Sequence, residues 1–137
     1  LGVRRQRQMC IRDRVHTGAA ISPPDDAVGA KQFYIHEYQD DYNRVVSGVR
    51  TFELVNNTWK YPYHIVKLDV HSGALIIPAK TWHRSVSGKE GSIVINQAKR
   101  YKGFNASEEF KPVSCAENNL LYKILLHEKP VIHRLGE

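Results

Sequence analysis

Two short stretches carry most of the information in this sequence: YIHEYQDD at residues 34–41, closed by Gly48, and GALIIPAKTWH at residues 73–83. Both contain aromatic or β-branched residues that favour strands, and both present a histidine beside other polar groups. A small β-barrel would bring the imidazoles and carboxylates of the two stretches to one cavity. Such a group of side chains suits a metal ion or a polar small molecule.

Most of the chain from residue 32 onward has the pattern of short strands separated by turns. The expected strands are rich in aromatic and β-branched residues and cover 32–37, 42–46, 49–55, 64–70, 74–77, 81–86 and 92–98. We expect turns at Ser47-Gly48 and Asn56-Asn57, and a hairpin loop at 87–91. This spacing predicts an all-β fold of the sandwich, barrel or jelly-roll type. Helical spacing occurs only at 118–127, which predicts one short C-terminal helix or a terminal strand.

The length of 137 residues, with 42% hydrophobic residues, matches a single domain with one core. We expect residues 15–31 to form an N-terminal arm and residues 32–137 to form the domain. No apolar run reaches the roughly 18 residues of a membrane span, and the N-terminus lacks the apolar stretch of a secretory signal. The sequence therefore predicts a cytoplasmic protein with no membrane partner.

The first 14 residues, LGVRRQRQMCIRDR, have neither strand nor helix periodicity. They look like translated adapter sequence at the end of a metagenomic reading frame, so we expect a non-native leader and leave it out of the fold prediction. This segment holds five Arg and one Asp, which leaves 15 basic against 13 acidic residues in the rest of the chain. We therefore expect no nucleic-acid partner, because a phosphate-binding surface needs clustered basic residues. Cys10 and Cys115 indicate neither a disulfide framework nor a cysteine zinc site.

The two stretches resemble the motifs of the cupin superfamily. The first family motif has two His separated by one residue, then Glu, then a Gly in the next turn. Here His36 stands at the second His, Asp41 replaces Glu, Gly48 closes the motif and Tyr34 stands at the first His position. The second motif runs Gly, Pro, often Gly, then His, and the chain has Gly73, Pro78, Lys80 and His83 at these positions, with one residue fewer between Gly73 and Pro78. The resemblance covers about residues 33–96 and implies a single-domain cupin-type jelly-roll β-barrel.

The resemblance also implies a metal site made of His36, Asp41 and His83, which has the composition of a two-His-one-carboxylate centre. The ion would be divalent iron, manganese, zinc or nickel. Asp is one methylene shorter than Glu, so either the strand comes closer or Asp40 serves instead. Side chains alternate along a strand, so Tyr34 and His36 would share one face of their strand and Asp41, Asn43 and Val45 one face of theirs. Both sets can line one cavity. Tyr34 could then be a ligand or a hydrogen-bonding partner.

Three functions are compatible with this set of residues. The first is a metal-dependent enzyme acting on a small organic acid or a sugar-like substrate. The second is a metal-independent sugar isomerase or epimerase, with His36 or His83 as the catalytic base and Tyr34 as the acid. The third is a non-catalytic cupin that binds a small ligand. Cupin-like barrels commonly pair through edge strands, so we expect a homodimer.

Overall fold

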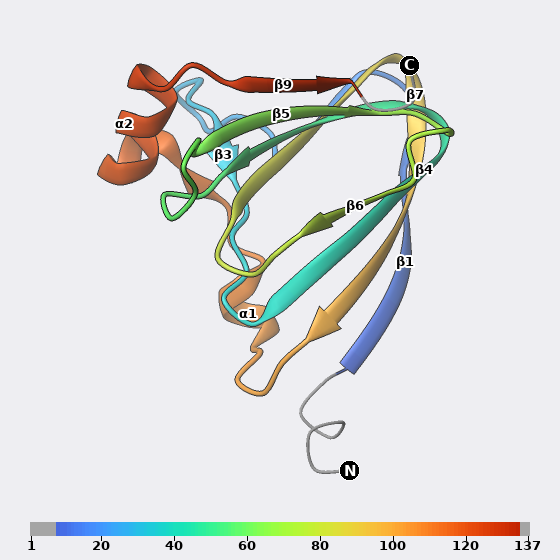
Figure 1. The fold of residues 1–137 in the computed structure, drawn as a ribbon, viewed down its shortest axis with the longest axis horizontal. Coiled ribbons are helices and arrows are strands. Elements are labelled where there is room, and N and C mark those ends of the chain that lie inside the picture. Colours follow the sequence, from blue (N-terminus) through green and yellow to red (C-terminus); the bar gives the residue numbers. More distant parts are fainter. Residues whose placement is uncertain (1–7, 135–137) are drawn as a thin grey trace.

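Two long antiparallel strands, β4 (Gln39–Val55) and β7 (Trp82–Arg100), form the centre of the fold. The structure is a computed structural model that describes residues 8–134. The other strands are β1 (Gln8–His16), β2 (Ala20–Ser22), β3 (Gln32–Phe33), β5 (Tyr63–Leu68), β6 (Ala74–Ile77), β8 (Val113–Ser114) and β9 (Val131–Arg134), and the helical segments are α1 (Ala106–Glu109), η2 (Cys115–Glu117) and α2 (Asn119–His127). Figure 1 shows β4 and β7 side by side along the length of the molecule.

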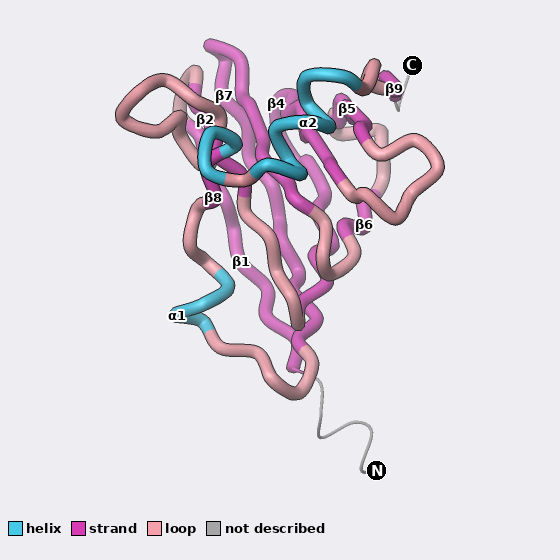
Figure 2. Tube along the Cα trace, turned by 90° about the vertical axis from the view of Figure 1, so that its left-hand side faces the viewer, coloured by secondary structure: helices cyan, strands magenta, loops and turns pink. Residues whose placement is uncertain are grey.

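β4 and β7 each change neighbours half-way, and this change folds the sheet over itself. Residues 41–44 of β4 pair with β6, whereas residues 50–55 pair with β5. Residues 92–100 of β7 pair with β1, whereas residues 85–87 pair with β2. The two halves of the sheet therefore become two facing layers of a jelly roll, as Figures 1 and 2 show from two directions. β9 extends the layer of β5 in parallel, and β3 pairs with β8 in a separate two-stranded sheet.

The change of layer occurs at two glycines that lie against each other. Gly48 in β4 has a φ of 75° and Gly91 in β7 a φ of 77°, in the left-handed region where a side chain would be strained. A Cβ atom on Gly48 would collide with the backbone oxygen of Gly91. The close approach lets both strands bend together, with a register shift between Gly48 and Arg50.

Two expected turns are therefore bends within continuous strands. The predicted turn at Ser47-Gly48 lies inside β4, and the predicted hairpin loop at 87–91 lies inside β7. A hairpin would pair residues 82–86 with residues 92–98, but both segments instead pair with β4. The predicted strand at 32–37 is also shorter, because only Gln32–Phe33 forms β3 and Tyr34 makes an isolated bridge to His83.

The core consists of two groups of buried apolar residues. One lies between the layers and is formed by Val45, Phe52, Leu54, Val66, Leu68, Ile77 and Val94. The other packs α2 against the end of the sheet through Phe33, Val55, Tyr63, Trp82, Leu121 and Ile124. The helix predicted at 118–127 is confirmed as α2, which begins after the cap Asn118, whose side chain accepts a 3.0 Å hydrogen bond from the Leu121 amide.

The N-terminal segment differs from the sequence expectation. Residues 8–14, which have no recognisable strand pattern, form most of β1 and pair in antiparallel register with residues 94–100 of β7. Residues 1–7 of the expected leader lie outside the described residues. Residues 15–31, expected to be an arm, contain the end of β1 and the whole of β2. β1 adds to the edge of β7 through antiparallel backbone pairing.

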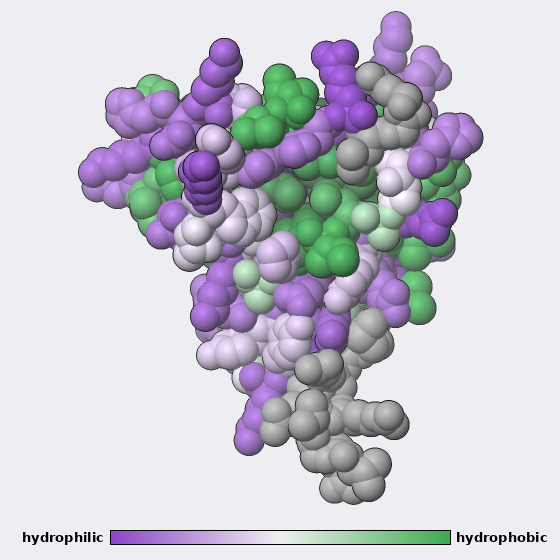
Figure 3. Space-filling model, viewed as in Figure 1, coloured by the Kyte–Doolittle hydropathy of each residue, from purple (hydrophilic) through white to green (hydrophobic). Residues whose placement is uncertain are grey.

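An apolar hollow opens on the face shown in Figure 3, between β5 and β6. Leu54, Val66 and Leu75 line it, together with Trp59. His64 and His133 close one side of this hollow, and their ring nitrogens lie 2.9 Å apart. No helix among residues 8–134 has the length and apolar composition needed to cross a membrane.

Candidate metal and ligand site

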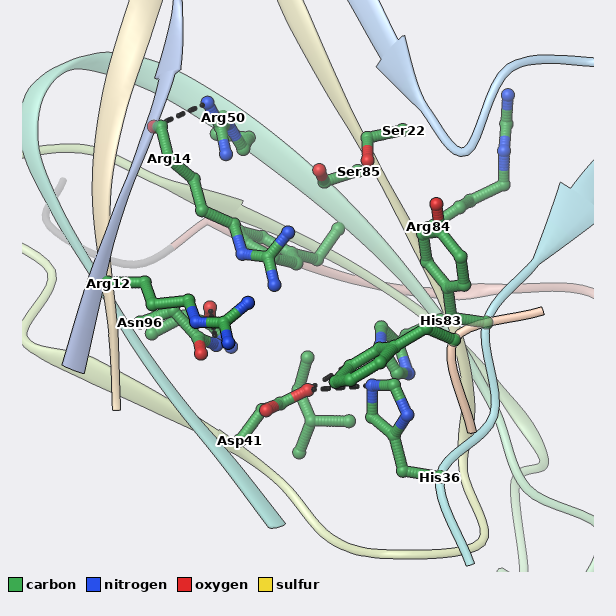
Figure 4. A pocket seen from close by; sticks show the side chains of 15 residues that line it. Arg12, Arg14, Ser22, His36, Asp41, Arg50, His83, Arg84, Ser85 and Asn96 are labelled. Carbon is green, nitrogen blue, oxygen red and sulfur yellow. Dashed lines mark hydrogen bonds and ion pairs between the residues drawn. The ribbon is translucent and has the colours of Figure 1, made fainter. Parts of the chain in front are cut away.

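A cavity of about 220 Å³ lies between the two layers and contains the residues that the sequence singled out. His36 follows β3, Asp41 lies in the first half of β4, and His83 lies in the first half of β7. Figure 4 shows their three side chains converging on one point. Their ligand atoms all lie within 4.8 Å of one another. The fold thus brings together residues that are separated by up to 47 positions in the sequence.

Asp41 is the centre of this group. Its Oδ2 lies 3.3 Å from Nε2 of His36 and 3.6 Å from Nε2 of His83. Ligand atoms about 2.1 Å from a shared ion at tetrahedral angles are about 3.4 Å apart, so the two distances from Asp41 fit a shared metal ion such as zinc. The other oxygen of Asp41 accepts a 2.7 Å hydrogen bond from Gln39, which fixes the orientation of the carboxylate.

Both histidines have their tautomer set by a backbone carbonyl. Nδ1 of His36 lies 2.8 Å from the carbonyl oxygen of Glu109, and Nδ1 of His83 lies 3.0 Å from that of Thr81. A carbonyl oxygen can only accept, so each Nδ1 carries a proton. In the neutral imidazole, each Nε2 then presents a lone pair toward Asp41. The two Nε2 lone pairs and the carboxylate of Asp41 are all hydrogen-bond acceptors, and they face one another. Because Asp41 and His36 are each only 5% exposed, water cannot separate them freely, and a shared proton or a cation must lie between them.

The electrostatics of the cavity keep His83 neutral. Burial, together with the charge of nearby His36, lowers the pKa of His83 to about 4 although Asp41 acts in the opposite direction. His83 is therefore neutral at pH 7 and free to act as a ligand. Burial raises the pKa of Asp41, but its interactions with His36, His83 and Gln39 outweigh that effect and hold the pKa below its usual value. Asp41 is thus ionised at neutral pH, as a ligand must be.

Tyr34 and Asp40 take different places. Tyr34 lines the same cavity, and its ring stacks on His36 with 6.4 Å between centroids and 15° between planes. Asp40 points to the other face of β4, where Oδ1 accepts a 2.7 Å hydrogen bond from the Ala79 amide and Oδ2 accepts one from the Tyr101 hydroxyl. Asp41, not Asp40, is therefore the carboxylate of the cavity.

Lys80 shows how the second motif keeps its shape without glycine. It stands where cupins often have Gly, and its φ of 67° is left-handed. Its amide donates a 2.7 Å hydrogen bond to the His36 carbonyl, so this turn ties the two motifs together. A non-glycine residue in this conformation costs roughly 1–2 kcal/mol.

Two residues at the C-terminal end of α1, Glu109 and Phe110, complete the surroundings of His36. The Glu109 side chain is buried and accepts a hydrogen bond from the Tyr38 amide, and its carbonyl oxygen orients His36. Phe110 lines the cavity and packs edge-on against His36 at 5.3 Å between ring centroids. The sequence offered no signal for either residue, because both reach His36 from the end of α1, more than 70 positions along the chain.

Arg84 also lines the cavity, and its charge is compensated by a carboxylate. Arg84 is 5% exposed and forms a buried ion pair with Glu53, and it lies 3.5 Å from Asp25. Glu53 also accepts hydrogen bonds from Tyr63 at 2.6 Å and Lys31 at 3.0 Å. Arg44, in the first half of β4, is by contrast exposed.

Comparisons with known proteins agree with this architecture. No protein-family model and no curated protein sequence matches the chain. Oxalate decarboxylase from Bacillus subtilis is a similar solved structure, with a TM-score of 0.54 and 12% identity over 75% of this chain and 24% of that chain. The formate complex of oxalate decarboxylase from Lactobacillus farciminis matches with a TM-score of 0.52 and 11% identity over 88% of this chain and 29% of that chain. The chain has the small cupin jelly-roll fold.

A smaller cupin matches over most of both chains. The 3,4-ketoisomerase QdtA from Thermoanaerobacterium thermosaccharolyticum, solved with TDP-4-keto-6-deoxyglucose, has a TM-score of 0.52 and 14% identity, and the match covers 84% of this chain and 68% of that chain. By contrast, the chain spans only about a quarter of the Bacillus subtilis decarboxylase. At these identities the comparisons establish the cupin fold and leave the reaction open.

Proposed function

We propose that this cupin is a metal-dependent enzyme acting on a small organic acid or sugar-like substrate, with His36, Asp41 and His83 as the metal ligands. The observation that carries the proposal is the convergence of two imidazole Nε2 atoms on one buried carboxylate oxygen, at 3.3 and 3.6 Å. Three protein ligands leave open positions for water or substrate. Bacillus subtilis oxalate decarboxylase, which has the same fold, is described with Mn(II) centres.

Each part of the chain would have a distinct task in such an enzyme. A bound divalent ion would polarise a substrate oxygen or activate a nucleophile. The Glu109 and Thr81 carbonyls would keep Nε2 of each histidine directed at the ion. Phe110 and Tyr34 would wall the cavity and limit water around the substrate. The cavity volume of about 220 Å³ favours a small substrate, since pockets for drug-sized ligands begin at roughly 300 Å³.

Elemental analysis tests this proposal. The protein is purified without a metal-affinity column and compared with His83→Ala and with His71→Ala, a control at an exposed histidine outside the cavity. We expect close to one divalent ion per chain in the wild type and in His71→Ala, and loss of the ion in His83→Ala. Equal metal content in all three proteins would overturn the assignment. Circular dichroism establishes that each variant is folded.

A metal-independent isomerase or epimerase is the second candidate. The stacking of Tyr34 on His36 places a phenol beside an imidazole in the cavity, and the match to the ketoisomerase QdtA covers most of both chains. His36 or His83 would remove a proton next to a carbonyl, and Tyr34 would return one. Turnover of a keto sugar that survives complete metal removal, and that is lost in Tyr34→Phe, would favour this candidate. A non-catalytic ligand-binding cupin would show neither bound metal nor turnover.

We also propose that the chain forms a cytoplasmic homodimer. β9 lies at one end of the sheet order and leaves an open strand edge, and Ile132 on that strand is 61% exposed. A second copy could cover this edge in an isologous interface. Light scattering in solution would then give a mass near twice the 15.7 kDa of the chain.

A further inference from the structure

Arg50 is a buried cation whose charge is not balanced by a carboxylate. It lies in β4 and is 2% exposed. Its guanidinium donates to Ser92 Oγ at 2.8 Å, to the Ser92 carbonyl at 3.3 Å and to the Arg14 carbonyl at 3.2 Å, all of which are neutral acceptors. Among the described residues, no carboxylate is within ion-pair distance of Arg50. A buried charge in this situation is costly unless a counter-ion joins it.

Arg50 belongs to the same cavity as the candidate metal ligands. Figure 4 shows Arg50 and the side chains of Arg12 and Arg14 on one side of the cavity, across from Asp41 and the two histidines. Burial, followed by the charge of Arg14, lowers the pKa of Arg50 to about 10. Arg50 nevertheless remains protonated at neutral pH.

The charges that line the cavity are predominantly positive. Arg84 is balanced by Glu53, so its charge is already compensated. Arg12, Arg14 and Arg50 remain, against the single carboxylate of Asp41. A divalent ion on His36, Asp41 and His83 would add two more positive charges. The cavity therefore lacks negative charge at the end that faces Arg50, and the polar side chains of Ser85 and Asn96 also line it.

We propose that the ligand of this cavity is a small carboxylate anion, with its carboxylate on Arg50 and the rest of the molecule extending toward His36, Asp41 and His83. The inference deepens the proposed function by naming the chemical class of the substrate. A planar guanidinium matches a carboxylate in geometry and charge, and the pair gains strength in a buried, low-dielectric site. The cavity volume of about 220 Å³ limits the anion to a few carbon atoms.

Arg50 is the residue on which the inference depends. It lies inside the β4 strand of the domain, whereas Arg12 and Arg14 belong to the segment expected to be a non-native leader. Arg12 and Arg14 strengthen the positive field but need not be the anchor. The double variant Arg12→Gln/Arg14→Gln is therefore expected to weaken anion binding without abolishing it.

Calorimetric titration of the full chain tests the inference directly. The probes are oxalate, malonate, succinate and glutarate, with succinamide as the uncharged control for succinate. At least one dicarboxylate is expected to bind saturably, and succinamide is not. Arg50→Gln should weaken this binding roughly 10- to 150-fold, as expected for the loss of a hydrogen bond between charged groups. Arg44→Gln, which removes the same charge from an exposed position on the same strand, should leave it unchanged.

The design separates this inference from the metal proposal. All titrations are repeated on protein whose metal has been removed by a chelator that is then desalted away. A difference between Arg50→Gln and Arg44→Gln that persists without metal supports the anion site even if no metal is ever found. Arg50→Lys keeps the positive charge but loses the planar set of guanidinium donors. This variant should therefore bind the dicarboxylate more tightly than Arg50→Gln does. Absence of saturable binding for all four dicarboxylates, or equal binding by the Arg50→Gln and Arg44→Gln variants, would overturn the inference.

Discussion

Acidification of the metal-free protein should destabilise it through His83. The unfolded chain has the ordinary histidine pKa of 6.5, whereas burial, followed by the charge of His36, lowers the pKa of folded His83 to about 4. The unfolded state therefore takes up the proton first as the pH falls. Stability from this residue is complete above pH 6.5 and decreases as the pH approaches 4. Between pH 7 and 4.5 the expected loss in the free energy of unfolding is about 2–3 kcal/mol.

Urea denaturation at pH 7.0 and 4.5 measures this loss. The wild type is compared with His83→Gln, which removes the titrating group, and with His71→Gln, which removes an exposed histidine. His16, whose pKa is lowered mainly by burial, adds a loss of the same sign to all three proteins. The lowered pKa of Asp41 changes the free energy of unfolding only as the pH falls below 3.8, the usual pKa of an aspartate, which is outside this pH range. An equal loss in the wild type and in His83→Gln would refute the reasoning.

Three further substitutions test the packing that supports the site. Arg84→Met leaves the buried Glu53 with the half-exposed Lys31 as its remaining ion-pair partner, and we expect urea denaturation to show a loss of about 3 kcal/mol, the lower end of the range for a broken buried pair. Gly48 has a φ of 75°, and in Gly48→Ala the added Cβ atom meets the Gly91 backbone. Urea denaturation should therefore show a loss of at least about 1–2 kcal/mol in the free energy of unfolding. Asn118→Ala removes the cap of α2 and should cost about 1 kcal/mol in thermal unfolding, with no change in bound metal.

The jelly roll was predictable because its strands follow ordinary local patterns. Residues 64–70, 74–77 and 92–98 alternate or concentrate β-branched residues, and the structure has strands at each of them. The bends at Gly48 and Gly91 were misread as chain reversals, since a glycine in a strand and a glycine in a turn look alike in sequence. β1 was not predicted because residues 8–14 show no strand periodicity, and only the folded chain reveals their pairing with β7.

The grouping of His36, Asp41 and His83 followed from the resemblance to the cupin motifs, and only the structure decides between Asp41, which faces the cavity, and Asp40, which faces away. The surroundings of the site could not be predicted in the same way. Glu109 reaches His36 across 73 positions, and Arg50 meets Ser92 across 42 positions. Such contacts leave no local periodicity, so only the folded chain reveals them.

Crystallographic localisation of a bound ion tests the central claim most directly. Crystals soaked in Zn²⁺ or Mn²⁺ should give an anomalous difference peak between Nε2 of His36, Oδ2 of Asp41 and Nε2 of His83, about 2.0–2.2 Å from each atom for zinc. A stoichiometric ion bound elsewhere, for example at the His64 and His133 pair, with no peak among these three residues would contradict the account.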